Sequence, residues 1–176
     1  AVDVHVHLRE PGFEYKGNMA SETKAMAKGG FTTVFSMPNL NPVPDSREHM
    51  KVQMDAIEHN AVIKVIPYGA ITKGEKGIEL SEMEELTDYT IAFSDDGKGV
   101  QREEMMRAAM KKAAELNCII VAHCEDESLL KEGGCIHDGH KAQEMGLVGI
   151  SSESEWKQIE RDIKLAEETG CQYHIC

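Results

Sequence analysis

Short apolar runs alternate with amphipathic segments along the whole chain. The first run, VDVHVHL, places Val2, Val4 and Val6 between polar residues, which is typical of a strand with one apolar face. Five further runs, TTVFSM, VIKVIPY, TIAFS, CIIVAH and CQYHIC, start at Thr32, Val62, Thr90, Cys118 and Cys171. Most starts lie about thirty residues apart, roughly the length of one β–α unit. The pattern therefore predicts six strands.

The segments between these runs repeat apolar residues at the spacing of an amphipathic helix. They predict helices over residues 19–28, 48–60, 102–116 and 153–168. Ser46 is a suitable N-cap for the second of these helices, and Gly29-Gly30 and Gly170 lie where helix C-caps are expected. We therefore expect strands and helices to alternate from one end of the chain to the other.

Regular alternation of this kind predicts an α/β fold with a parallel sheet, either a barrel or a doubly wound sheet. No GxGxxG or GxxxxGK[ST] loop follows any of the runs, which disfavours a doubly wound nucleotide-binding fold. Because a closed (β/α)8 barrel needs eight strands, six strands predict an incomplete TIM-like barrel. Residues 131–152 fit neither pattern, so we expect a lid, a partner surface or a solvated insertion there.

Composition narrows the class of protein. The 176 residues are 41% hydrophobic and 28% charged, as expected for one soluble globular domain. The formal charge of −12 disfavours a nucleic-acid or anionic-membrane surface, and no apolar run approaches the roughly 20 residues of a membrane span. The first residues do not resemble a secretory signal, although the chain begins inside a predicted strand. Five cysteines without a disulfide or zinc-ribbon spacing favour reduced thiols and a cytoplasmic location.

Candidate chemistry gathers at the ends of the predicted strands. His5 and His7 are two residues apart, so they project to the same side of the first strand, opposite valines that we expect to pack beneath helices. Asp95 and Asp96 follow the fourth run and His123 ends the fifth. Histidine and carboxylate together favour a divalent ion such as Zn²⁺, whereas the alternative is a pair of hydrogen-bonded core histidines. Alternation does not decide which aspartate faces the site.

Other polar residues are weaker candidates. Arg9 is suited to bind a substrate carboxylate, or alternatively to form a salt bridge at the rim of the site. Asn39 is suited to bind a substrate, or alternatively to shape a proline-rich turn. Cys124 is expected to be a buried small apolar residue. The remaining histidines are expected on a helix surface or in the irregular segment, namely His49, His59, His137 and His140.

Several motifs occur together in one order along the chain. They are DVHVHLREPG, KGGFTTVFSMPNLNPVPDS, FSDDGKGVQ, VAHCEDESL and AEETGCQYHIC. In this combination the sequence closely resembles the dihydroorotases of the amidohydrolase superfamily over essentially its whole length. It is most similar to the larger bacterial type, which uses an aspartate where related families use a carboxylated lysine.

The resemblance implies a zinc enzyme that interconverts N-carbamoyl-L-aspartate and L-dihydroorotate, a step of pyrimidine biosynthesis. By motif position, His5 and His7 would hold the more buried zinc ion and His123 the second. Asp96, directly before a glycine, would bridge the two ions. The substrate carboxylate would be held by Arg9 and Asn39. The expected partners are this small-molecule substrate, further copies of the subunit and a neighbouring pathway enzyme.

Several parts of the family pattern are expected to lie outside residues 1–176. They are a histidine after the sixth strand, a catalytic aspartate of the eighth strand, the last two barrel units and a small β-sandwich domain. His174 lies three positions short of the expected histidine, so we interpret it as internal to a strand. We therefore expect the 176-residue chain alone to show no turnover.

Two alternative functions remain open. A hydantoinase-like or allantoinase-like enzyme would need a lysine near the end of the fourth strand, where Lys98 is poorly placed. A non-catalytic assembly subunit would usually lack the histidine pair, whereas His5 and His7 are both present.

Overall fold

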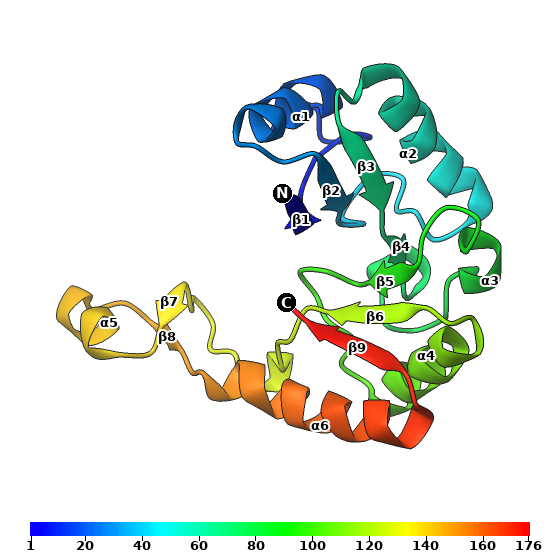
Figure 1. Ribbon diagram of the computed structural model, residues 1–176. Helices are drawn as coiled ribbons and strands as arrows, with labels where there is room; N and C mark the ends of the chain where they lie inside the picture. Colours follow the sequence, from blue (N-terminus) through cyan, green and yellow to red (C-terminus); the bar gives the residue numbers. More distant parts are fainter.

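The computed structural model describes residues 1–176 and contains two main parallel sheets. The first has the order β1 (Val2–Val6), β2 (Thr33–Ser36) and β3 (Lys64–Pro67). The second has the order β4 (Gly69–Ala70), β5 (Ala92–Ser94), β6 (Ile119–Ala122) and β9 (Gln172–Ile175). Figure 1 shows these strands following one another along a curved arc with the larger helices on its outer side. The predicted α/β class is confirmed.

The helices lie close to their predicted positions. They are α1 (Met19–Lys28), α2 (Arg47–Asn60), α4 (Glu103–Glu115) and α6 (Glu153–Thr169), with a short α3 (Met83–Leu86) that the sequence did not predict. Ser46 is the N-cap of α2, and its hydroxyl accepts a hydrogen bond from the main chain of His49. Gly170, in the left-handed conformation, ends α6. The predicted caps therefore do set these helix boundaries.

The chain passes from the first sheet to the second directly after the third predicted strand. Its residues form β3, but after Tyr68 the chain leaves β2 and pairs with β5 as β4. Tyr68 holds the chain against the first sheet at this point, because its amide donates a hydrogen bond to Ser36 O and its hydroxyl donates one to Val4 O. Gly69 then passes so close to Phe93 that a Cβ atom would lie 2.7 Å from the ring. The arc is accordingly two sheets and is not a closed barrel.

The core lies mainly between the strands and the outer helices. The larger cluster includes Met106 and Met110 of α4, Phe93 of β5, Ile120 of β6 and Leu165 of α6. A smaller cluster lies beneath α1 and α2 and contains Val6, Leu8, Met19, Val34 and Val65. Burial of each large apolar side chain contributes about 1.5–3 kcal/mol, so these two clusters fix the helices against the strands.

The expectation that all three valines of the first strand pack beneath helices is wrong. Val6 is buried with Met19, whereas Val2 and Val4 are 58% and 41% exposed. The reason is the position of β1 at the edge of its sheet, where β2 is its one neighbour and helix contacts begin only at Val6. The alternating pattern predicted the strand correctly, but it did not predict that the side chains of Val2 and Val4 are exposed.

The segment expected to be irregular contains regular elements. A two-stranded parallel pair, β7 (Ile136–His137) and β8 (Gly149–Ile150), encloses α5 (His140–Met145). In Figure 1 this arm projects away from the arc. Two short 3₁₀ turns, η1 (Lys73–Glu75) and η2 (Glu127–Leu129), complete the elements. None of the helices is both long and apolar enough to cross a membrane.

Candidate metal centre

An irregularity in β1 lies directly beside the histidine pair. Asp3 pairs with Val34 and Val6 with Ser36, so β1 has one more residue than β2 across this interval. Such a β-bulge changes the direction in which neighbouring side chains point. The carboxylate of Asp3 accepts a hydrogen bond of 3.1 Å from the amide of His5. Asp3 thereby satisfies a main-chain donor at the point where the ladder is disturbed.

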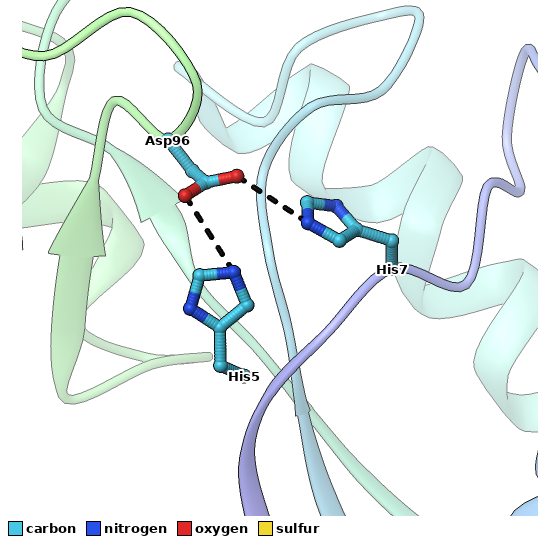
Figure 2. A group of neighbouring side chains, drawn as sticks. All are labelled: His5, His7 and Asp96. Atoms are coloured by element: carbon cyan, nitrogen blue, oxygen red, sulfur yellow. Dashed lines mark ion pairs between the residues drawn. The ribbon is translucent and has the colours of Figure 1, made fainter. Parts of the chain in front are cut away.

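His5, His7 and Asp96 come together although more than eighty residues separate the aspartate from the histidines. Oδ1 of Asp96 lies 3.6 Å from Nε2 of His5, and Oδ2 lies 3.4 Å from Nε2 of His7. Figure 2 shows the carboxylate between the two imidazoles. Side-chain exposure is 7% for Asp96 but 33% and 30% for the histidines. The group is therefore anchored at the aspartate and open on the histidine side.

The geometry of this group fits a divalent ion. One donor atom from each of the three residues lies within 4.8 Å of the others. Two ligands about 2.1 Å from a tetrahedral zinc ion would be roughly 3.4 Å apart, close to the nitrogen–oxygen separations found here. Imidazole nitrogen and carboxylate oxygen are also the donors that zinc accepts. The three side chains thus form a candidate metal centre.

The surroundings of His7 change its pKa. Partial burial lowers the pKa of His7, and the nearby Asp96 carboxylate opposes this effect only in part. A lower pKa favours the neutral imidazole, which is the form that binds a metal ion. Burial therefore shifts the equilibrium of His7 toward the form that a metal ligand requires.

His123 lies at the edge of this group. Its Nδ1 is 3.8 Å from Oδ1 of Asp96, and its Nε2 is 3.7 Å from a carboxylate oxygen of Glu125. The Nε2 atom is buried and has no hydrogen-bond partner. A buried polar atom without a partner is costly, which is consistent with a ligand at this position. The sequence did not single out Glu125, the acid nearest this nitrogen.

The two adjacent aspartates after β5 have different surroundings. Asp95 is buried and points toward the β4 end, where it accepts hydrogen bonds from the amides of Ile71 and Thr72 at 2.8 and 3.0 Å and from the Thr72 hydroxyl. Burial raises the pKa of Asp95 to about 6, and these hydrogen bonds oppose that rise. Asp95 therefore connects the end of β5 to the chain after β4, and Asp96 is the aspartate that faces the histidines.

The two residues expected to bind substrate line one cavity. It has a volume of about 340 Å³, and Arg9, Asn39 and Lys98 are among its lining residues. Nδ2 of Asn39 donates a hydrogen bond to the main-chain oxygen of Asp96, while its Oδ1 is buried without a partner. Arg9 has a φ of 66°, a region that residues other than glycine seldom occupy. Glu75, which the sequence did not suggest, also lines this cavity.

The remaining candidates lie elsewhere. His49 and His59 are on α2, and His137 and His140 are exposed on the arm. His174 lies within β9 and is exposed, which agrees with its interpretation as internal to a strand. Cys124 is buried as expected, but its sulfur also lies 3.2 Å from the hydroxyl of Tyr173. That contact belongs to a polar cluster that the sequence pattern did not indicate.

Comparison with known proteins decides the family. A family model described as Dihydro-orotase-like matches residues 1–176. The chain belongs to this family. Its relatives include a dihydroorotase of Fusobacterium nucleatum, 53% identical over 175 residues, and one of Staphylococcus epidermidis, 53% identical over 176 residues. Each comparison covers 99% of this chain but only 41% of the relative. This member of the dihydro-orotase-like family therefore spans about two fifths of the length of the relatives it matches.

Solved structures of more distant proteins share the fold. An L-hydantoinase (dihydropyrimidinase) from Arthrobacter aurescens superimposes with a TM-score of 0.79 at 19% identity, over 99% of this chain and 40% of the other. A D-hydantoinase (dihydropyrimidinase) from Thermus sp. gives a TM-score of 0.67 at 21% identity, with the same coverage. At this level of identity the likeness concerns the fold of the dihydro-orotase-like chain.

Proposed function

We propose that this chain is part of a zinc-dependent dihydroorotase that interconverts N-carbamoyl-L-aspartate and L-dihydroorotate. The observation that carries the proposal is the convergence of His5, His7 and Asp96, whose donor atoms lie within 4.8 Å of one another. The 53% identity with dihydroorotases over nearly the whole chain supports the same reaction. Imidazole and carboxylate ligands suited to zinc, beside a cavity for a small anion, fit this chemistry.

Each site residue has a distinct role in this proposal. His5, His7 and Asp96 would hold one zinc ion, and His123 would contribute to a second that Asp96 bridges. Zinc supplies a Lewis acid and lowers the pKa of a bound water to about 7. Arg9 and Asn39 line the cavity and would bind the substrate carboxylate, the guanidinium of Arg9 through paired hydrogen bonds. Asn39 also fixes the main chain at Asp96, so one residue would position both the substrate and a metal ligand.

The same proposal covers the architecture. Residues 1–176 would form a metal-dependent hydrolase barrel domain that is an incomplete (β/α)8 barrel with about six of its strands. The remaining barrel units, a small β-sandwich domain and the catalytic aspartate would come from a longer protein. The coverage of 41% of the relatives supports this arrangement, as does the position of β1 and β9 at the edges of their sheets. Contacts with further copies of the subunit and with a pathway enzyme are part of the proposal.

Turnover by the full-length protein tests the function. We expect hydrolysis of L-dihydroorotate, loss of this activity on treatment with a chelator and its return when zinc is added. Hydantoin serves as the competing substrate, and faster turnover of hydantoin than of dihydroorotate would contradict the proposal. The 176-residue chain alone is expected to be inactive, so turnover of carbamoyl aspartate by that chain would contradict the proposed architecture.

A further inference from the structure

Helix α6 carries buried polar side chains on the face that packs against the strands. Gln158 is 3% exposed and Asp162 is fully buried, and being four residues apart they share one face of the helix. Burial of an acid and an amide is costly unless every polar atom finds a partner. The partners of these two residues therefore indicate what the cluster holds in place.

Asp162 is the centre of the cluster. Its Oδ1 accepts a hydrogen bond of 2.7 Å from Nε of Arg161, and its Oδ2 accepts one of 3.1 Å from the hydroxyl of Tyr173 in β9. Nε2 of Gln158 lies 3.4 Å from the same Oδ2. The buried carboxylate thus orients both Arg161 and Gln158, and each of these side chains also forms hydrogen bonds outside the helix.

Gln158 reaches the loop after β6 through two bonds. Its Nε2 donates to the main-chain oxygen of His123 at 3.0 Å, and its Oε1 accepts from the amide of Glu125 at 3.0 Å. One amide group therefore clamps the main chain on both sides of Cys124. Neither bond involves a side chain of the candidate metal centre.

Arg161 reaches the loop after β5 in the same manner. Its two terminal nitrogens donate to Gln101 O at 2.7 Å and to Val100 O at 2.8 Å, a few residues beyond Asp96. Gly99 lies where this loop approaches the other, because a Cβ atom there would be 2.9 Å from the main-chain oxygen of His123. Neighbouring side chains on α6 thus hold the two loops that carry Asp96 and His123.

We propose that Gln158 is a positioning residue that, with Arg161 and Asp162, fixes the His123 loop relative to the Asp96 loop. The 3.8 Å separation between Nδ1 of His123 and Oδ1 of Asp96 would depend on this clamp. Residues that orient metal ligands from outside typically change metal affinity 10- to 100-fold when they are replaced. The inference rests on the proposed function for its zinc readout, but the ordering of the loop can be measured without metal.

The experiment uses the full-length protein with Gln158→Leu and, as an unbranched side chain of similar length, Gln158→Met. The matched controls are Gln53→Leu and Gln53→Met, because Gln53 is equally buried but bonds to Ser36 beneath α2. Zinc affinity is measured by competition with a chelator. Hydrogen–deuterium exchange of the segment 123–127 is measured on metal-free protein, and circular dichroism reports folding. The Gln158 variants are expected to bind zinc about tenfold or more weakly and to exchange faster around Glu125.

Each outcome decides the inference. Folded Gln158 variants with weaker zinc binding and faster exchange, beside Gln53 variants that match the wild type, support it. Unchanged zinc affinity in the Gln158 variants overturns it, whatever their exchange. Unfolding of both Gln158 variants while the Gln53 variants fold also overturns it, because Gln158 would then stabilise the whole fold. If wild-type protein binds no zinc, the proposed function fails, and exchange alone then supports or overturns the positioning of the loop.

Discussion

Nδ2 of Asn39 donates a hydrogen bond to the main-chain oxygen of Asp96 and so joins the loop after β2 to the loop after β5. The two residues are 57 positions apart in the sequence. The bond fixes the main chain at the residue whose carboxylate lies between His5 and His7. An asparagine expected to bind substrate or to shape a proline-rich turn therefore also fixes the main chain at the candidate bridging acid.

Replacement of Asn39 is expected to weaken metal binding as well as substrate binding. In full-length Asn39→Ala the Asp96 loop loses its bond to the β2 side, so zinc affinity should fall about tenfold and KM for dihydroorotate should rise. Asn60→Ala is the control, because Asn60 is exposed and bonds only to Glu10. Zinc per subunit after dialysis and steady-state kinetics give the readout. An Asn39→Ala protein with full zinc content would show that the bond does not matter to the centre.

The two adjacent aspartates should behave in opposite ways. Asp96→Ala removes an acid that faces two imidazoles, so bound zinc should be lost while the metal-free protein unfolds near the wild-type temperature. Asp95→Ala leaves the buried amide of Thr72 without its acceptor and leaves the amide of Ile71 only its longer bond to Ser94 O, so it should lower the free energy of unfolding by about 2–4 kcal/mol. Metal analysis and thermal denaturation of both variants separate these effects. Equal zinc content in the two variants would refute the assignment.

Local pattern was sufficient to predict most of the elements. Helices α1 and α6 begin where their apolar spacing begins, and the cap at Ser46 and the glycine at 170 set boundaries that need no tertiary information. The passage from β3 to β4 in the second sheet could not be predicted, because the break at Tyr68 depends on hydrogen bonds to Ser36 and Val4. Exposure of Val2 likewise depends on which strand is at the sheet edge, and alternation alone does not show that.

The candidate site was partly predictable for a similar reason. His5, His7 and Asp96 lie at strand ends, and parallel strands bring such ends to one edge, so the structure places them together as expected. Their role as ligands stays a prediction. Gln158 and Asp162 gave no such signal, because polar residues at helical spacing are equally typical of a solvated face. Only the packing of α6 shows that this face is buried.

Removal of the Asp3 carboxylate should disturb the histidine pair, although Asp3 itself is not one of the candidate metal ligands. In full-length Asp3→Ala the amide of His5 loses its acceptor beside the β-bulge, and His5 should become less well ordered. We expect zinc affinity to fall by about tenfold, as for other residues that orient ligands. Asp55→Ala is the control, because Asp55 is an exposed residue of α2. If both variants retain wild-type zinc affinity, the bulge is held without Asp3.

Stability should fall with rising pH because of Glu75. This side chain is 5% exposed, and its Oε1 has no hydrogen-bond partner. Burial, assisted by the nearby charge of Asp95, raises the pKa of Glu75 from 4.5 to about 8. Between these two values the unfolded chain releases the proton and the folded chain retains it, so stability decreases with pH across this window. Above about pH 8 the folded protein also releases the proton, and the loss is complete.

Full-length Glu75→Gln keeps the neutral shape of the side chain and removes its titration. The variant should match the wild type at pH 4 and exceed its free energy of unfolding at pH 9 by roughly 5 kcal/mol. Urea denaturation at a series of pH values gives the difference between the two proteins, in which the titration of groups that do not interact with Glu75 cancels. Glu58→Gln on α2 is the control and should follow the wild-type profile. A Glu75→Gln protein that is less stable than the wild type at pH 9 would mean that the ionised carboxylate has a partner in the folded protein.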